Sequence, residues 1–175
     1  NAEAFLYKQE DTLKEIKALL NNTPDVVKAL QKLLSEESAL KSELDTLQRA
    51  HAIRLKKELL ASSIERSGYR LFVLQGEEKA DIIKDIAFQL RGELQEPFVF
   101  LAATTEGARG LLSVMLSEEA VTLGLHAGNL VKEAACLIQG GGGGQPHFAT
   151  AGGEDANGLP QALELILSRV DAHAR

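Results

Sequence analysis

Apolar residues recur at helical spacing over the first sixty-odd positions of the chain. The first apolar stripe consists of Leu6, Leu13, Ile16 and Leu20, and no Gly or Pro interrupts it. Residues 21–25 then break the pattern with two asparagines and a proline. We expect Asn to end the first helix, and Thr23 to cap a second helix that has Pro24 at its first position.

The second predicted helix is long, from about residue 24 to residue 64. A seven-residue repeat of apolar side chains runs along it, formed by Val26, Leu33, Leu40 and Leu47. Leu30 and Leu44 fill the alternate positions, and Glu37 and His51 interrupt them. An apolar stripe of this length must be buried against a partner. The partner is the first helix in a packed hairpin, a second copy of the chain, or another part of a parent protein.

After Arg66-Ser67-Gly68 the pattern changes to alternating strands and helices. It predicts strand 69–75, helix 79–94, strand 98–103, turn 104–110, strand 111–117, helix 127–138, strand 147–151 and helix 159–170. The run 98–103 is continuously apolar, which is typical of a strand buried on both faces. We therefore predict an α+β or α/β chain: a long-helix hairpin stalk (1–65), then a small mixed-sheet domain of order β-α-β-β-α-β-α (66–175).

Composition narrows the function classes. Of 175 residues, 19 are Lys or Arg and 25 are Asp or Glu, so the net charge is -6. A dedicated duplex-binding protein usually carries a basic footprint. Aromatic residues make up 5% and Trp is absent, which argues against a broad stacking platform for single strands. Contact with nucleic acid would therefore depend on a local patch, on shape, or on a larger protein.

The cellular setting is predicted from cysteine usage and hydropathy. Cys136 is the single cysteine, so an intrachain disulfide is impossible and a cytoplasmic location fits. No run approaches the roughly 20 apolar residues that cross a bilayer, so we expect no membrane partner. The start, Asn1-Ala2, is not a signal peptide and is typical of a fragment left after tag removal.

The most informative feature is a run of five consecutive glycines, Gly140 to Gly144, followed by Gly152-Gly153. A flexible surface loop is one interpretation. The other is a surface where a backbone or a phosphate approaches closely and is held by backbone N–H groups. A phosphate loop of the Walker type and a dinucleotide fingerprint are both excluded. The glycines precede a strand, not a helix, and no Lys-Ser or Lys-Thr follows them.

The segment 124–153 reads GLHAGNLVKEAACLIQGGGGGQPHFATAGG. It resembles the glycine-rich accessory domain found beside DHH-type phosphoesterases, a domain that also closes the alanyl-tRNA synthetases. The residues that match this motif are Gly140 to Gly144, Pro146, Ala149, Ala151, Gly152 and Gly153. The flanking GLHAGNLVKEAA and HFATAGG look like the synthetase version, and the long helices upstream fit it as well.

The resemblance implies a module that binds tRNA at its outer corner, where the D and T loops meet, and that supports dimerisation in some members. The implied parent is an ATP-dependent alanine–tRNA ligase, which carries out alanylation and editing with other domains. The fragment itself would be no enzyme and would have no catalytic residue or cofactor. ATP, Mg and Zn belong to the missing domains. Partners would be tRNA(Ala), those domains and a possible homodimer through the helices.

The candidate RNA-binding residues are Gly140, Gly141, Gly142, Gly143, Gly144, Gln145, Gly152, Gly153, Asn129 and Lys132. Asn129 and Lys132 lie three apart on the predicted helix before the glycines, so both can face one surface. Gln145 occupies a position where members of the family often carry a basic residue, so we expect weak binding that depends on the parent. We also expect Gly142→Val to keep the fold and lose RNA binding.

Two other functions compete with this interpretation. One is the nucleotide- or phosphate-binding accessory domain of a DHH-type phosphoesterase, which would require a catalytic domain upstream; the long amphipathic helices argue against it. The other is a coiled-coil dimerisation scaffold with an inert globular cap. A metal site is not expected, because the four histidines are scattered and no carboxylate–His cluster has ligand spacing.

Overall fold

The computed structural model describes residues 2–66 and 68–173, with side chains from residue 5 onward. The chain divides into two compact units, Asn1–Arg49 and Ala50–Arg175. Each unit is described by itself below.

The first unit holds α1 (Ala2–Leu19) and the larger part of α2 (Val26–Ala61). Asn21 and Asn22 take left-handed backbone angles (φ 57° and 54°), and the Asn22 N–H donates to the Lys17 carbonyl at 2.6 Å, so asparagine ends α1 as predicted. The prediction for α2 is corrected. Asp25 supplies the cap, because its Oδ1 accepts from the Lys28 N–H at 3.0 Å, and the helix begins at Val26.

The apolar stripe of α2 stays open to solvent in the single chain. Leu33, Leu40 and Leu47 are 54%, 65% and 62% exposed. Leu6 and Leu13 of α1 are also exposed. Helix α1 therefore does not bury the apolar stripe of α2, as the predicted packed hairpin would require. Burying the stripe requires a surface from outside this unit.

The second unit is built on a six-stranded mixed sheet of order β1-β2-β3-β4-β6-β5. Its strands are β1 (Ile64–Arg66), β2 (Tyr69–Glu77), β3 (Phe98–Glu106), β4 (Arg109–Leu116), β5 (Gly140–Gly144) and β6 (Phe148–Gly153). Strands β2 and β3 pair in parallel and every other pair is antiparallel. Strand β3 is buried on both faces over residues 98–104, as its apolar sequence predicts. The predicted α+β class with a mixed sheet is confirmed.

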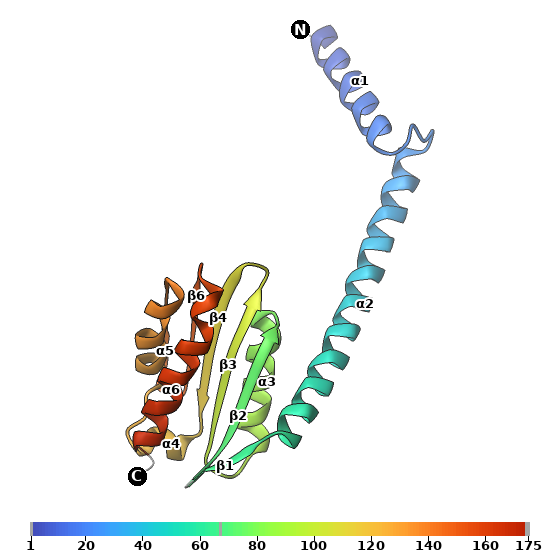
Figure 1. Ribbon diagram of the computed structural model, residues 1–175. Helices are drawn as coiled ribbons and strands as arrows, with labels where there is room; N and C mark the ends of the chain where they lie inside the picture. The colour runs from blue at the N-terminus through green and yellow to red at the C-terminus, as the bar shows by residue number, and fades with distance from the viewer. Residues whose placement is uncertain (1, 67, 174–175) are drawn as a thin grey trace. The chain divides into compact units, whose positions relative to one another are not determined.

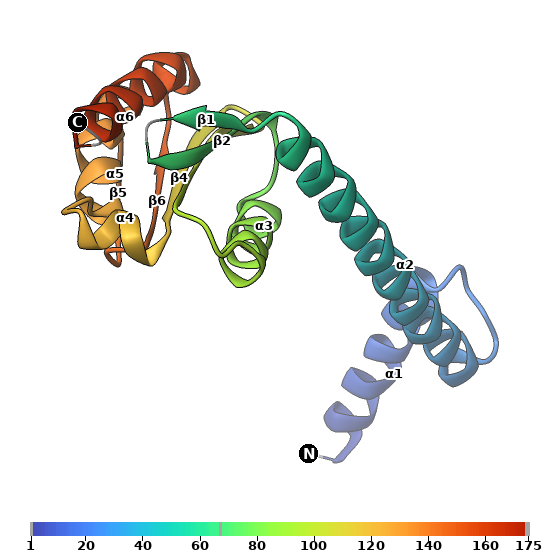
Figure 2. The ribbon, with the colours of Figure 1, turned by 90° about the horizontal axis from the view of Figure 1, so that it is seen from below.

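Helices cover both sides of this sheet (Figures 1 and 2). One side carries α3 (Ala80–Glu93). The other carries α4 (Glu118–Thr122), α5 (Ala127–Ala135) and α6 (Leu159–His173), with short 3-10 turns η1 (Cys136–Ile138) and η2 (Ala156–Gly158). The core is accordingly divided into two clusters, one on each side of the sheet. The sequence did not predict α4, a five-residue helix capped by the Ser117 hydroxyl.

The C-terminal turns of α2 belong to the second unit. Ala52 and Leu59 are buried in the cluster beneath α3, and Lys56 Nζ bonds Glu93 Oε1 at 2.7 Å. His51 Nε2 lies 2.5 Å from Glu78 Oε1. The unit therefore begins at Ala50, whereas the sequence placed the domain boundary after residue 65. The difference arises because these turns provide core side chains.

Removing these turns should destabilise the sheet domain. We expect the fragment 50–175 to unfold cooperatively, and 62–175 to melt at a markedly lower temperature. Leu59→Ala in the longer fragment should cost about 3 kcal/mol, since it empties a fully enclosed site. Ile53→Ala, on an exposed position of the same helix, should cost less than about 0.5 kcal/mol. Equal melting temperatures for the two fragments, measured by circular dichroism, would contradict this assignment.

Candidate nucleic-acid interface

The five glycines form strand β5, which rules out the flexible surface loop, one of the two interpretations of the sequence. Gly140–Gly144 pair antiparallel with β6, with Gly142 opposite Ala151 and Gly143 opposite Thr150. Because β6 pairs on its other side with β4, β5 lies at the edge of the sheet. A glycine strand has low intrinsic strand propensity, so its order must come from packing.

The glycines of β5 alternate between two environments. A Cβ added to Gly140, Gly142 or Gly144 would overlap backbone atoms of β6, among them the Gly152, Thr150 and Phe148 carbonyl oxygens respectively. A Cβ added to Gly141 or Gly143 would meet no atom within 4 Å. The two environments alternate because successive Cβ positions of a strand point to opposite faces. Strand β6 therefore excludes a side chain at Gly140, Gly142 and Gly144, although Gly142 and Gly144 are exposed to solvent, whereas Gly141 and Gly143 have room for one. We call the first set of positions closed and the second open.

The open side of β5 is the side of the sheet that carries α3. In β6, Ala149 and Ala151 pack in the cluster beneath α5 and α6, whereas Phe148 packs against the cluster beneath α3. Thr150 and Gly152 alternate with the two alanines and therefore share the α3 side with Phe148. Residues directly opposite in an antiparallel pair share a face, which places Gly143 beside Thr150 and Gly141 beside Gly152. We name Gly141, Gly143, Thr150 and Gly152 the open glycine face.

Helix α5 packs against the other side of β5. A Cβ on Gly128 would lie 2.8 Å from the Gly144 carbonyl oxygen, so helix and strand approach at backbone distance. The Ala127 N–H donates to the Pro146 carbonyl at 2.8 Å. Gln145 closes the turn between β5 and β6, with its N–H donating to the Phe148 carbonyl at 2.8 Å. The predicted contact residue Gln145 thus lies at one end of the open glycine face, with its side chain exposed.

Asn129 and Lys132 share the exposed face of α5, as their spacing predicts. The structure does not bring them to the open glycine face, because α5 covers the opposite side of the sheet. Gly153 is likewise turned to the closed side, where an added Cβ would overlap the Ile138 carbonyl oxygen. The ten predicted residues therefore fall on two surfaces, and their roles in RNA binding stay predictions.

The expectation that Gly142→Val keeps the fold is wrong. Gly142 faces the closed side, where even one Cβ would overlap the Ala151 side chain and the Thr150 carbonyl. Gly143 is the position at which a side chain can be added to test the surface without disturbing the fold.

Two polar contacts join α6 to its neighbours, one to α5 and one to strand β2. Arg169 of α6 binds Glu133 of α5, with Nε 3.3 Å from Oε2, and this hydrogen bond lowers the pKa of the Glu133 carboxyl. The Tyr69 hydroxyl donates to Asp171 Oδ1 at 2.6 Å. Burial, followed by that hydrogen bond, raises the Tyr69 pKa well above its ordinary value, so the hydroxyl remains a donor at neutral pH.

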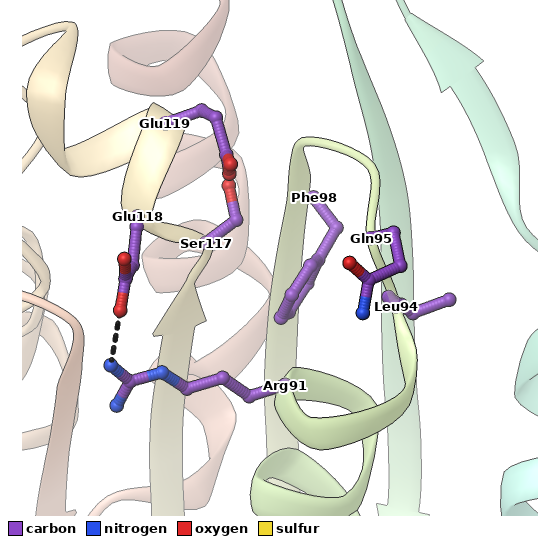
Figure 3. Close-up of a pocket in the computed structure, with 7 residues that line it drawn as sticks. All are labelled: Arg91, Leu94, Gln95, Phe98, Ser117, Glu118 and Glu119. Carbon is purple, nitrogen blue, oxygen red and sulfur yellow. Dashed lines mark hydrogen bonds and ion pairs between the residues drawn. The ribbon is translucent and has the colours of Figure 1, made fainter.

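A separate hollow of about 220 Å³ lies between the end of α3 and the start of α4 (Figure 3). Its lining includes Arg91, Gln95, Glu118 and Glu119. Arg91 Nη2 already bonds Glu118 Oε1 at 3.2 Å, and Glu119 adds a second carboxylate. This charge pattern does not suit a phosphate, so the hollow is not part of the candidate RNA interface.

Within residues 2–66 and 68–173, no three His, Cys, Asp or Glu side chains gather in a way that could hold a metal ion. In the same part of the chain, no helix combines the length and the apolar character that crossing a membrane requires.

The structure adds residues to this surface that the sequence did not single out. Phe88 of α3 contacts Phe148 with ring centroids 5.2 Å apart, and Thr150 is exposed between the open glycines and that pair. On the same side, the Thr104 hydroxyl is buried, and its oxygen has no hydrogen-bond partner among the described residues. Strand register places Thr150 beside Gly143, and register cannot be deduced from a single sequence.

The fold agrees with comparisons to known proteins. Residues 68–172 match the model of the DHHA1 domain, and the chain belongs to this domain family. The chain is similar to the alanine–tRNA ligase of Porphyromonas gingivalis, at 47% identity over 171 residues, and to that of Parabacteroides distasonis, at 41% over 169. The resemblance predicted from the glycine motif is therefore confirmed.

These alignments cover 97% of the chain, but only 20% and 19% of the two ligases, so the chain spans about a fifth of the length of these relatives. Among solved structures, the C-Ala domain of Aquifex aeolicus alanyl-tRNA synthetase superimposes with a TM-score of 0.56. The sequence identity is 21%, and the match covers 63% of this chain and 98% of that one. At this identity the likeness supports the fold alone.

The alternation along β5 predicts opposite outcomes for neighbouring positions. Gly142→Ala should destabilise the domain by about 3 kcal/mol or more, because β6 backbone would have to move. Gly143→Ala should change stability by less than about 1 kcal/mol, since its Cβ enters open space and the unfolded chain loses entropy. Thermal unfolding of both variants checks this. Similar losses at both positions would show that the two faces are not distinct.

Proposed function

We propose that this chain is the tRNA-binding module of an alanine–tRNA ligase, and that it contacts the outer corner of tRNA(Ala) through the open glycine face. Other domains of the parent would carry out alanylation and editing. The observation that carries this proposal is an edge strand of five glycines, ordered by packing on one side and open on the other. Similarity to alanine–tRNA ligases over nearly the whole chain supports it.

An open glycine strand suits RNA for a steric reason. Without side chains at Gly141 and Gly143, a ribose or phosphate can reach the strand backbone directly. Folded RNA is recognised largely through its shape, its 2′-hydroxyls and its phosphates. Backbone amides provide hydrogen bonds to these groups without requiring a basic side chain. This fits a chain that carries a net charge of -6.

The net negative charge of the chain limits its affinity for tRNA. Each neutralised phosphate contributes to binding by releasing counterions, and a site made of backbone neutralises few. The isolated chain should therefore bind weakly, and tethering to the parent would raise the effective concentration of tRNA at this surface. The family alternative, an accessory domain of a phosphoesterase, is less well supported. The similarity to the ligases includes the helical residues before position 68 as well as the domain.

The stalk provides a second role for the module. Exposed leucines at seven-residue spacing on α2 favour a homodimer in which two stalks bury their stripes against each other. A cytoplasmic location follows from the proposed tRNA partner. ATP, Mg and Zn would be bound by other domains of the parent.

Binding can be tested with a tRNA(Ala) transcript and a non-cognate tRNA, titrated at two salt concentrations. We expect micromolar or weaker binding to both, reduced by salt, because the outer corner is common to tRNAs. Gly143→Val should weaken binding about tenfold or more, since its side chain keeps the RNA backbone away, while the melting temperature changes little. Wild-type protein that binds neither tRNA, even at high micromolar concentration, would overturn the proposal.

The dimer can be tested by light scattering over a range of concentrations. We expect a dimer that Leu40→Glu converts to a monomer, because the charge would be buried at the centre of the seam. Ser42→Glu lies two positions along α2, on another side of the helix, and should leave the dimer intact. A monomer at every concentration of the wild-type chain would exclude the homodimer.

A further inference from the structure

Helix α3 borders the open glycine face with an exposed aromatic residue. Phe88 is 43% exposed, although it contacts Phe148 of β6 with ring planes inclined at 60°. Of the other large apolar side chains of this helix, Ile83, Ile86 and Leu90 are fully buried and Ile82 is half-buried. Phe88 therefore lies on the flank of α3 that faces β6, outside the main core.

Residues directly opposite one another on neighbouring strands form a row across the sheet, and these rows place Phe88 at one end of the open glycine face. Phe148 lies opposite Met115, and Thr150, the next residue of β6 on the same side, lies opposite Ser113 and Gly143. Side chains two apart on a strand are separated by about 7 Å. A ring on Phe88 is thus one row away from the exposed Thr150 and the open backbone of Gly143.

Lys84 stands one helical turn before Phe88 on the same flank, because residues four apart share a helix face. Strand β2 ends at Glu77 and α3 begins at Ala80, so the start of α3 lies at the end of the sheet where Gly76 pairs with Thr104. Lys84 lies one turn, about 5.4 Å, closer to that end of the sheet than Phe88. It is therefore displaced from the row of Phe148 toward the row of Thr150. Lys84 is exposed and brings a positive charge to this border.

We propose that Phe88 and Lys84 form a stacking and phosphate-binding border for RNA, in which an exposed nucleobase stacks on Phe88 and an adjacent phosphate contacts Lys84. The inference rests on the proposed function and assigns a base contact to a surface otherwise made of backbone. A ring and a cation one turn apart match a base and its neighbouring phosphate. A protein partner would fit less well, because the glycines offer no side chains with which to interdigitate.

The chain contains no Trp, which provides a direct reporter. The single tryptophan of a Phe88→Trp variant should be quenched when tRNA(Ala) transcript is added, since stacking on a base quenches indole fluorescence. A blunt A-form RNA duplex of similar length, whose bases are stacked internally, should cause little quenching. Because Phe88→Trp keeps an aromatic ring at this position, the fluorescence measurement tests stacking even if Phe88→Leu disturbs the contact with Phe148.

Affinity provides the second measurement. Phe88→Leu keeps an apolar side chain against Phe148 but removes the ring, and should weaken tRNA binding about tenfold with little change in melting temperature. Lys84→Ala should weaken binding and reduce the slope of log affinity against log salt by about one, whereas Lys84→Arg should preserve both.

The outcomes separate the two proposals. If wild-type protein binds tRNA but Phe88→Leu binds equally well and the Phe88→Trp fluorescence is unchanged, the border is wrong and the glycine-face proposal stands. If Gly143→Val retains full affinity while Phe88→Leu loses it, RNA contacts α3 and not the glycine strand. If wild-type protein binds no tRNA, both proposals fail, and a protein partner becomes the candidate for this surface.

Discussion

The second unit depends on the approach of three backbones, those of β5, β6 and α5, to distances that exclude a Cβ. Gly142 lies against Ala151 at such a distance, and Gly128 against Gly144. A glycine run loses more conformational entropy on folding than any other sequence of its length. The run is ordered because strand pairing and helix packing act on it together. The closed side of β5 therefore fixes the strand and leaves its other side available.

The arrangement of α3 determines how much of that other side remains available. Helix α3 and the end of α2 cover the large apolar row formed by Phe72, Phe100 and Met115. This row ends at Phe148 of β6, and the next row across β4, β6 and β5 is small or polar, with Ser113, Thr150 and Gly143. Small residues bury little apolar area, so there is little energetic gain in covering them with another helix. The sheet consequently stays uncovered where the backbone is most accessible.

Much of this fold could be predicted from the sequence, because local patterns decide most of it. The apolar run at 98–103, the amphipathic pattern of α3 and the asparagines at the joint each specify a local structure. Strand β5 could not be predicted, because glycine contributes no periodic side chain and its pairing with β6 is a tertiary effect. The division of the glycines into closed and open positions, and the meeting of Phe88 with Phe148, depend on register in the same way.

The open side of β5 has a consequence for how the module can change over time. A binding surface made of backbone cannot be adjusted by exchanging residues within the strand: three of its positions accept no side chain, and the other two would lose the close approach if they gained one. If the open glycine face binds RNA as proposed, variation in affinity or in preference between RNA shapes comes from the border, in the turn at Gln145 and along the flank of α3. On that proposal the strand would stay constant while its surroundings diverge, and homologous modules would share one glycine signature while binding different RNA shapes.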